Sequence, residues 1–421
     1  MFTRRAFIKS GGLALFSATV GGNPLFLNRV ARATRALGPF KKRKILVAIF
    51  QRGAMDGLMA VTPFNDPMVM KLRPRLGMSA AQSKGAEALF DLDGRFGLHP
   101  ALRAFLPLYK EGRLAIIHGV GSPDPTRSHF DAQDYMETAT PGRKGTQSGW
   151  LNRASGLLGH DATPFRAVAV TPALPRSLYG DYPALAIANL DDFGVRVPGR
   201  TSLAQAAGES FETLYEQTSQ QLLQGTGRDS FDAVKLLSKT EVRNYRPADG
   251  VEYPKTALGN SLRQVAQLVK SDVGLEVAFA ETVGWDTHVQ QGTVTGQFAT
   301  HANDLSHSIT SFWKDVEQYQ DDIVLMTMTE FGRTVHENGS GGTDHGRASC
   351  SFVLGNVVDG GKVYGSVPAL VPEQLDDRRD LPVTTDFRSM FSEVAEAHLR
   401  IAKESILFPG WSGQPLSFLK K

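Results

Sequence analysis

Carboxylates and histidines follow several apolar runs of this 421-residue chain, at positions where buried strands are expected to end. The runs are 45–50, 275–280 and 323–328, and a polar loop precedes a further run at 351–354. The side chains beside them are Asp56, Glu281, Asp286, His288, Glu330, Asp344 and His345. Neutral imidazole and carboxylate oxygen satisfy a divalent metal and leave a position open for a substrate. Each residue alone could be a turn residue or a helix cap, but together they predict a hydrolytic metal centre.

A hydroxyl group follows another apolar run, 114–120, in the sequence RSHFD at 127–131. Ser128 and Asp131 have a spacing like that of a capping box, which favours a helix N-cap at Ser128. At a helix N-terminus beside a metal, the same hydroxyl could attack phosphorus or sulfur, because amide donors and the helix dipole stabilise an anionic transition state. The two roles are compatible. His129 could be a metal ligand, a hydrogen-bond partner of the substrate or a core histidine, and the sequence does not choose.

Three arginines near these motifs, Arg127, Arg333 and Arg347, are candidate catalytic residues. A guanidinium group binds a tetrahedral oxyanion in a bidentate manner, so each could hold the equatorial oxygens of a reacting group. The spacing does not select one of them.

Short β-rich apolar runs alternate with segments of helical period. We expect strands at 45–50, 114–120, 167–171, 275–280, 323–328 and 351–354, and a helix from Phe298 to Val316. Such alternation indicates a parallel sheet with helices on both faces, and ligands of these sheets bind beyond the carboxyl ends of the strands. The prediction is a doubly wound, mainly parallel α/β fold. The less regular stretch 161–254 is expected to be an inserted cap region.

The first 33 residues have the pattern of an export signal. TRRAFIK at 3–9 precedes an apolar, small-residue stretch at 11–22 and then ARA at 31–33, which is typical of a twin-arginine signal with a small-x-small cleavage site. The apolar stretch is too short to span a bilayer comfortably. We therefore expect a signal at 1–33, a folded domain at 44–421 with no stable membrane span, recognition by the twin-arginine export machinery, and a periplasmic or secreted location.

Charge and cysteine content restrict the classes of function. The chain has 46 Lys and Arg against 43 Asp and Glu, a net charge of +3. Residues 1–33 hold five of the basic residues and no acid, so the remainder carries 41 − 43 = −2, and nucleic-acid binding is not expected. The single Cys350 excludes an internal disulfide and cysteine-rich metal sites. A metal must therefore be held by nitrogen and oxygen.

Five motifs carry a resemblance to known proteins: RGAMDG at 52–57, RSHFDAQD at 127–134, GWDTH at 284–288, TEFGRT at 329–334 and DHGR at 344–347. Their order resembles the alkaline phosphatase and sulfatase superfamily, and within it a bacterial family of exported proteins with a twin-arginine signal. The resemblance implies a doubly wound sheet that binds one to three metals.

The resemblance also implies roles for single residues. In alkaline phosphatases, a first-strand aspartate on the second metal matches Asp56, and the nucleophilic serine matches Ser128. A glutamate on magnesium matches Glu281. The ligands of the first zinc match Asp286, His288 and His345. Where these enzymes have adjacent aspartate and histidine, this chain has Glu330 and Phe331, which removes one imidazole and leaves Glu330 to hold or support a second metal.

These observations predict an exported metal-dependent hydrolase of phosphate or sulfate esters, small or borne on a polymer. Zinc is the expected metal, with magnesium, calcium and manganese as alternatives. A formylglycine sulfatase is not expected, because neither Cys-x-Pro-x-Arg nor Ser-x-Pro-x-Arg occurs at the helix start. The missing imidazole at Phe331 motivates an alternative: a non-catalytic envelope or surface factor that binds an anionic polymer or a protein partner. The sequence does not determine the oligomeric state.

Overall fold

The computed structural model describes residues 43–78, 88–160, 162–190 and 245–420. In these residues, nine strands form one sheet in the order β11-β5-β10-β9-β1-β8-β6-β7, with β12 paired to β5. The strands are β1 (Ile45–Gln51), β5 (Leu114–Gly121), β6 (Ala167–Ala169), β7 (Leu185–Ala186), β8 (Val277–Thr282), β9 (Ile323–Met328), β10 (Ser349–Leu354), β11 (Lys362–Tyr364) and β12 (Thr385–Asp386). The expected signal at 1–33 and most of the expected cap, 191–244, lie outside the described residues.

The central strand β1 shows how the sequence covers both faces of the sheet. Side chains alternate along a strand, so every second residue faces the same core. Ile45, Val47 and Ile49 pack into one core, and Leu46, Ala48 and Phe50 pack into the other. Both sets are buried, as expected for a strand with helices on each side.

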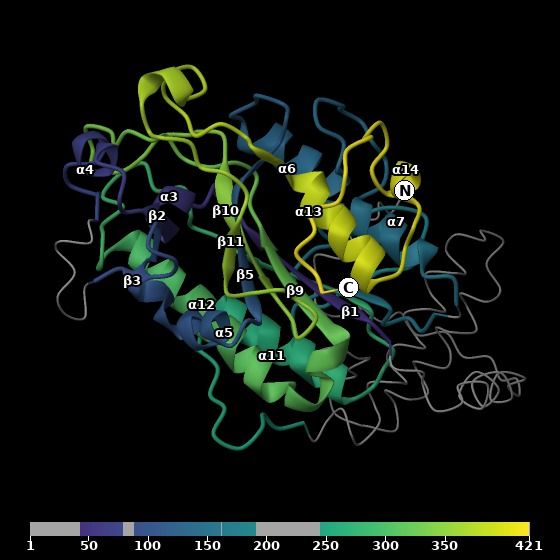
Figure 1. Cartoon of the computed structure of the whole chain (residues 1–421). Coiled ribbons are helices and arrows are strands. Elements are labelled where there is room, and N and C mark those ends of the chain that lie inside the picture. The colour runs from purple at the N-terminus through teal and green to yellow at the C-terminus, as the bar shows by residue number, and fades with distance from the viewer. Residues whose placement is uncertain (1–42, 79–87, 161, 191–244, 421) are drawn as a thin grey trace, which may run out of the picture.

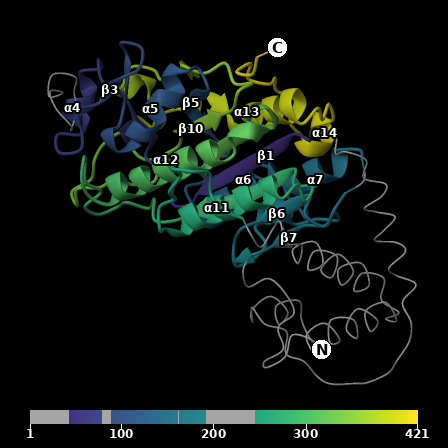
Figure 2. The ribbon, with the colours of Figure 1, turned by 90° about the horizontal axis from the view of Figure 1, so that it is seen from below.

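The helices lie in two layers (Figures 1 and 2). One layer contains α5 (Leu106–Lys110), α11 (Ala257–Lys270) and α12 (Gln297–Asp315), and the other contains α6 (His129–Thr138), α7 (Trp150–Leu157), α13 (Phe387–Glu393) and α14 (Glu404–Leu407). Two short helices, α3 (Gly57–Ala60) and α4 (Met68–Leu72), lie near a small sheet of β2 (Val61–Pro63), β4 (Phe96–Leu98) and β3 (Phe90–Asp91). The predicted doubly wound α/β fold is confirmed.

Every predicted strand and the predicted helix are present, with shifts of one or two residues at several ends. The sheet is mainly parallel, as predicted, and β10 is the strand that runs antiparallel to both its neighbours, β5 and β9. Residues 329–348, which join β9 to β10, contain no helix. Without a crossover helix, the chain turns back on itself instead of returning in parallel. The start of β10 therefore lies at the same sheet edge as the carboxyl ends of its neighbours.

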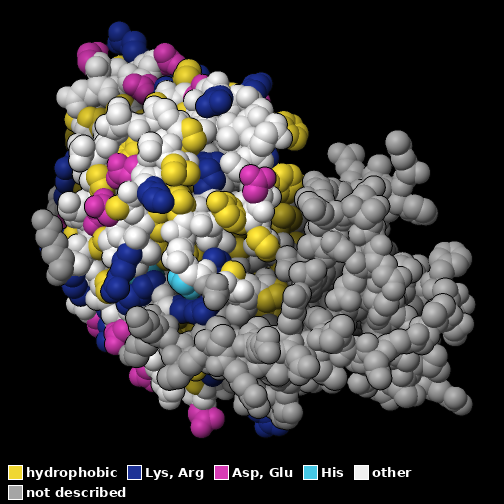
Figure 3. All heavy atoms as spheres, turned by 90° about the vertical axis from the view of Figure 1, so that its right-hand side faces the viewer, with side chains coloured by type: hydrophobic (Ala, Val, Ile, Leu, Met, Phe, Trp, Pro, Cys, Tyr) yellow, Lys and Arg dark blue, Asp and Glu magenta, His cyan; other side chains and the backbone are white. Residues whose placement is uncertain are grey.

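One face of the molecule shows both signs of charge among its described residues. On the face that carries α7, α13 and α14, Lys and Arg side chains are interspersed with Asp, Glu and hydrophobic side chains (Figure 3). Among the described helices, none combines the length and the apolar character that a bilayer crossing needs.

Candidate metal centre

Four side chains meet at the sheet edge where β5, β8 and β9 end and β10 begins. His129 is the first residue of α6, Asp286 and His288 follow β8, and His345 precedes β10. The Nε2 atom of His345 lies 3.0 Å from Nε2 of His129 and 2.8 Å from Nε2 of His288. The Oδ1 atom of Asp286 lies 3.1–3.5 Å from all three of these nitrogens. We call His129, Asp286, His288 and His345 the donor cluster: the donor atoms of His129, Asp286 and His345 all lie within 4.8 Å of one another, and His288 adjoins them through His345 and Asp286.

The other ring nitrogen of each histidine contacts an oxygen outside the cluster. The Nδ1 contacts are His129 to Glu330 Oε1 at 2.7 Å, His288 to Asp344 Oδ1 at 3.0 Å, and His345 to the carbonyl of Arg127 at 2.8 Å. Carbonyl and carboxylate oxygens only accept hydrogen bonds, so each Nδ1 carries the hydrogen. Each neutral ring then presents its lone pair at Nε2, toward the other rings. Histidines that bind a metal typically show this pattern, in which Nδ1 donates to an oxygen outside the site and Nε2 faces the metal.

This arrangement fits a cation better than a proton. The hydrogen bond to Glu330 raises the pKa of His129, whereas burial lowers the pKa of His345. A proton on His129 Nε2 would satisfy its contact with His345. That proton would leave the contact between Nε2 of His288 and Nε2 of His345, at 2.8 Å, unchanged. A divalent cation relieves the repulsion among these lone pairs and the oxygen of Asp286, and the donor set suits it.

Glu330 lies beneath the cluster and is fully buried. Its Oε1 atom accepts hydrogen bonds from Nδ1 of His129, from Nε2 of Gln133 at 2.8 Å and from the amide of Gly53 at 2.9 Å. Burial opposes ionisation, but these donors hold the pKa of Glu330 below its usual range. The carboxylate therefore contacts a cluster histidine from behind and fixes its tautomer and ring orientation.

Arg333 lies behind Asp286 in the same way. Its buried guanidinium donates to Asp286 Oδ1 at 2.5 Å, and its other bonds go to the carbonyls of Gly53, Ala54, Trp285 and Thr343. Although burial raises the pKa of Asp286, the hydrogen bond and charge of Arg333 lower it below the ordinary value. Arg333 thus keeps Asp286 ionised, and its donors are used inside the protein.

Asp344 and Asn338 orient His288. Asp344 Oδ1 accepts from Nδ1 of His288 and from Nδ2 of Asn338, both at 3.0 Å. Asn338 also donates to the backbone carbonyl of His288 at 2.9 Å. The hydrogen bond from Asn338, followed by that from His288, lowers the pKa of Asp344. The sequence singled out Asp344 but not Asn338, whose amide lies in the glycine-rich turn 338–342.

The two remaining candidate arginines are engaged by protein oxygens. Arg127 donates to the buried Asp380 at 2.5 and 3.0 Å and to Asp377 at 2.8 Å. Its backbone carbonyl accepts a hydrogen bond from Nδ1 of His345. Arg347 lies 3.5 Å from Asp376 and donates to the carbonyl of Ser122. Arg127 therefore positions a cluster histidine through its backbone.

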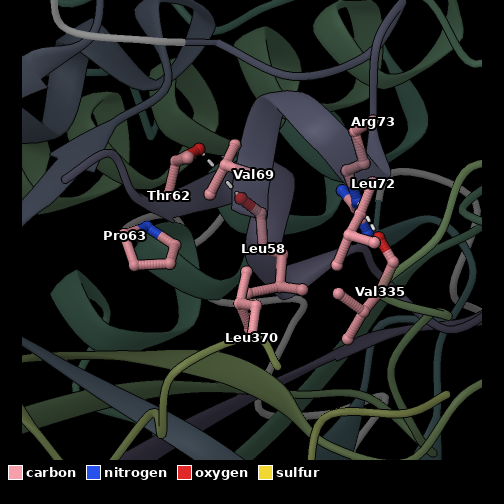
Figure 4. A pocket seen from close by; sticks show the side chains of 8 residues that line it. All are labelled: Leu58, Thr62, Pro63, Val69, Leu72, Arg73, Val335 and Leu370. Carbon is pink, nitrogen blue, oxygen red and sulfur yellow. Dashed lines mark hydrogen bonds between the residues drawn. The ribbon is translucent and has the colours of Figure 1, made fainter. Parts of the chain in front are cut away.

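Asp56 does not join the cluster. It is buried, forms a bidentate ion pair with Arg73 at 2.8 and 3.1 Å, accepts from Gln291 at 2.7 Å and caps α3. Arg73 also lines a small pocket with mainly apolar walls (Figure 4), where it donates to the carbonyl of Val335. The carboxylate oxygens of Asp56 are thus committed to structural partners.

Glu281 is likewise paired elsewhere. Its Oε2 atom lies 2.6 Å from Nε of Arg52, and Nη1 of Arg52 is 3.0 Å from Glu137 and from Gln133. The Arg52 guanidinium links Glu281 to Gln133, which in turn contacts Glu330. Glu281 therefore lies at the margin of the site, among its outer supports.

Ser128 is the N-cap of α6, as predicted. Its Oγ atom accepts from the amide of Asp131 at 3.5 Å, and the residue is exposed beside His129. The hydroxyl lies at the positive end of a ten-residue helix whose first residue is His129.

His129 is the cluster member that the sequence left open among three roles. The signal that points to it is its place: an imidazole at the first residue of the helix that follows a predicted strand. Its partner Gln133, one turn later on α6, gave no signal of its own because glutamine is common on helix surfaces.

Residues 115–407 match the model of a protein family described as "Protein of unknown function (DUF1501)". The chain belongs to the DUF1501 family. The matched range contains all four residues of the donor cluster. A comparison with curated proteins finds no match.

Solved structures similar to this DUF1501 protein include members of the alkaline phosphatase and sulfatase group. The C-terminal periplasmic domain of EptC from Escherichia coli, in complex with Zn, has a TM-score of 0.35 and 10% identity over 75% of this chain and 73% of that one. A protein in the alkaline phosphatase superfamily from Vibrio parahaemolyticus has a TM-score of 0.30 and 9% identity, over 78% of this chain and 64% of that one. The sulfatase PsFucS1 from Pseudoalteromonas sp. has a TM-score of 0.33 and 11% identity, over 82% of this chain and 69% of that one. Likenesses this weak assign no role to any residue here.

Proposed function

We propose that this protein is an exported, metal-dependent hydrolase of phosphate or sulfate esters, with zinc bound by the donor cluster. The observation that supports this is the convergence of three imidazole Nε2 atoms on one carboxylate oxygen, each Nδ1 being held by an outer acceptor. Imidazole-rich sites suit zinc, whereas magnesium and calcium prefer sets made of oxygen. Export is proposed from the twin-arginine pattern at 1–33.

The chain's own residues would divide the work as follows. Asp286 and His288 are partly exposed, so a substrate can reach the cluster from solvent. Bound zinc would supply a Lewis acid that polarises a phosphoryl or sulfuryl oxygen. Ser128 Oγ would lose its proton and attack the phosphorus or sulfur atom while the bond to the ester oxygen breaks and the alcohol leaves with a proton, and water would then release phosphate or sulfate from the serine. The amides at the start of α6 would stabilise the developing negative charge.

The proposal contains a single metal. A second metal would need Asp56, Glu281 or Glu330, but Arg73 and Arg52 already neutralise the first two, and the buried Glu330 is engaged by His129, Gln133 and the amide of Gly53. The proposal also gives Arg127 and Arg333 positioning roles, because their guanidinium groups are bonded to protein oxygens.

The hydrogen bonds that the three candidate arginines make to protein oxygens also favour a second candidate function. Arg127, Arg333 and Arg347 all bond to protein oxygens, which leaves the binding of an oxyanion to the cluster and the start of α6. A non-catalytic envelope factor on the same fold, with zinc in a structural or binding role, would have the same contacts. Turnover separates the two functions.

The test is to purify the exported protein, measure its bound metals, and assay 4-nitrophenyl phosphate, bis(4-nitrophenyl) phosphate and 4-nitrophenyl sulfate. We expect one zinc ion per chain, activity that a chelator removes and zinc restores, and a kcat at least about a hundredfold lower in Ser128→Ala with zinc retained. The exposed Ser412→Ala is the control. Turnover at the wild-type rate in both Ser128→Ala and His345→Ala would refute the assignment, and zinc binding without turnover of any ester would favour the non-catalytic factor.

A further inference from the structure

The three most exposed large hydrophobic side chains of the described residues belong to segments that carry residues of the donor cluster: the start of α6 and the loop after β8. Phe130 is 90% exposed, Val283 62% and Val289 53%. Phe130 directly follows His129, Val289 directly follows His288, and Val283 lies three residues before Asp286. Single exposed apolar residues are normal on a protein surface. Here the most exposed ones all come from two segments that meet at one site.

The local backbone explains why these side chains stay in solvent. His129 starts α6 and turns its ring toward His345, so Phe130, the next residue on the helix, points elsewhere. Val283 precedes Gly284, whose positive φ of 94° reverses the loop after β8 and buries Trp285 beneath it. The fold thus places the cluster ligand inward and its apolar neighbour outward.

The cluster also has an apolar floor. The ring of Phe331 is 3% exposed and lies 4.8 Å from the ring of His129 and 5.0 Å from that of His345, centroid to centroid. Ala54 and Ala132 pack with Phe331 in a small separate core. An apolar floor and exposed apolar neighbours thus accompany the donor atoms.

The nearest charged group on the same helix turn is already paired. Asp131 lies 2.9 Å from Nζ of Lys144, and this ion pair is formed between two side chains of the described surface. Because Asp131 is paired with Lys144, the surface beside Phe130 can contribute apolar contact to a ligand more readily than an unpaired charge.

We infer that the ester taken by this centre carries an apolar aryl or alkyl group, which packs on the rim formed by Phe130, Val283 and Val289 while its phosphate or sulfate group binds the donor cluster. This inference rests on the hydrolase proposal above. Covering these side chains removes apolar surface from water, and each fully buried methylene is worth about fourfold in affinity.

The test compares methylphosphonate with octylphosphonate, and methylsulfonate with octylsulfonate, by calorimetric titration into the zinc-loaded protein. These probes are not hydrolysed, so binding is measured apart from turnover. We expect the octyl probe of at least one pair to bind at least about tenfold more tightly, which needs only about two buried methylenes. Phe130→Ala should remove most of that ratio and leave the methyl affinity and zinc content unchanged. Ile406→Ala, an exposed apolar side chain on α14, is the matched control and should change neither.

Equal affinities within both pairs, or an unchanged ratio in Phe130→Ala, would overturn the inference. So would binding of the wild type to phosphatidylcholine vesicles that Phe130→Ala abolishes, with no preference between the probes, because the rim would then face a membrane. An octyl preference that depends on Phe130, together with no turnover of any ester, would support the apolar ligand and refute the hydrolase proposal alone.

Discussion

Two sets of three histidines in this protein use their ring nitrogens in opposite ways. In the core set, His99, His118 and His398, the Nε2 atom contacts a backbone carbonyl at 3.0–3.1 Å. In His99 and His118 the Nδ1 atom accepts from a backbone amide close in sequence. In the cluster set, His129, His288 and His345, it is Nδ1 that contacts an oxygen, and the Nε2 atoms of His129 and His288 both face that of His345.

The difference lies in the partner, since the residue type is the same. A core histidine whose two nitrogens are bonded to backbone is a structural element with no lone pair left over. A histidine whose Nδ1 hydrogen is held by an outer acceptor presents a lone pair at Nε2, and such lone pairs gathered around one carboxylate oxygen make a binding site. Burial lowers the pKa of each core histidine to about 4, which keeps these rings neutral.

The largest expected effect concerns the core set and acid. The unfolded chain binds a proton on each histidine near pH 6.5, but the folded core does so only near pH 4. The unfolded state therefore binds more protons between these values, and stability present above pH 6.5 is lost as the pH falls toward 4. Each core histidine contributes up to about 3 kcal/mol to that loss.

Denaturant titration of the metal-free protein at several pH values measures this effect without the contribution of metal release. His118→Gln is expected to flatten the dependence, because it removes one of the three groups. A free energy of unfolding that stays constant from pH 7 to pH 4.5 would contradict the assignment of these rings as neutral core groups.

The next effect separates the two sets directly. His345→Ala should lower zinc affinity by more than about 100-fold, because even an outer-shell partner contributes 10–100-fold. His118→Ala should leave zinc affinity unchanged and lower the free energy of unfolding by about 2–4 kcal/mol, since it leaves a cavity and two unpaired backbone groups. Chelator competition measures the first quantity and denaturation of the metal-free proteins the second. An equal loss of zinc affinity in both variants would erase the distinction.

A smaller effect tests the outer acceptors. Glu330→Gln keeps the size of the side chain but replaces the charged acceptor of His129, so zinc affinity should fall about 10–100-fold. Glu276→Gln is the matched control: Glu276 is also buried and accepts from a histidine, His160, at 2.6 Å, but it does so away from the cluster. It should change stability and not zinc affinity. If the two variants retain the same zinc affinity, Glu330 has no role in the centre.

The strands and their ends could be predicted because they depend on local pattern. The run at 323–328 became β9 without a change of bounds, and β1 differs by one residue. The direction of β10 could not be predicted in the same way, because it depends on whether residues 329–348 cross over the sheet or turn back. That direction decides where His345 lies.

Asp56 and Asp286 show how far the sequence could predict the residues of the site. Both are aspartates that follow a strand, and the sequence treats them alike. Arg73 neutralises Asp56 completely inside the protein, while Arg333 supports Asp286 and leaves it partly exposed beside three imidazoles. No local pattern distinguishes the two arginines, because their partners lie 17 and 47 residues away along the chain.

The sequence by itself determined the alternation of strands and helices, the α/β fold, the strand ends that bear acids and imidazoles, and the N-cap at Ser128, because these follow from hydrophobic period and local hydrogen bonding. The tertiary structure alone decided which of those side chains share a point in space and which ring nitrogen each histidine turns toward it. The physical reason is that the partner of Nδ1 decides whether a histidine can bind a metal through Nε2. For His129, His288 and His345, that partner lies 56 to 218 residues away along the chain.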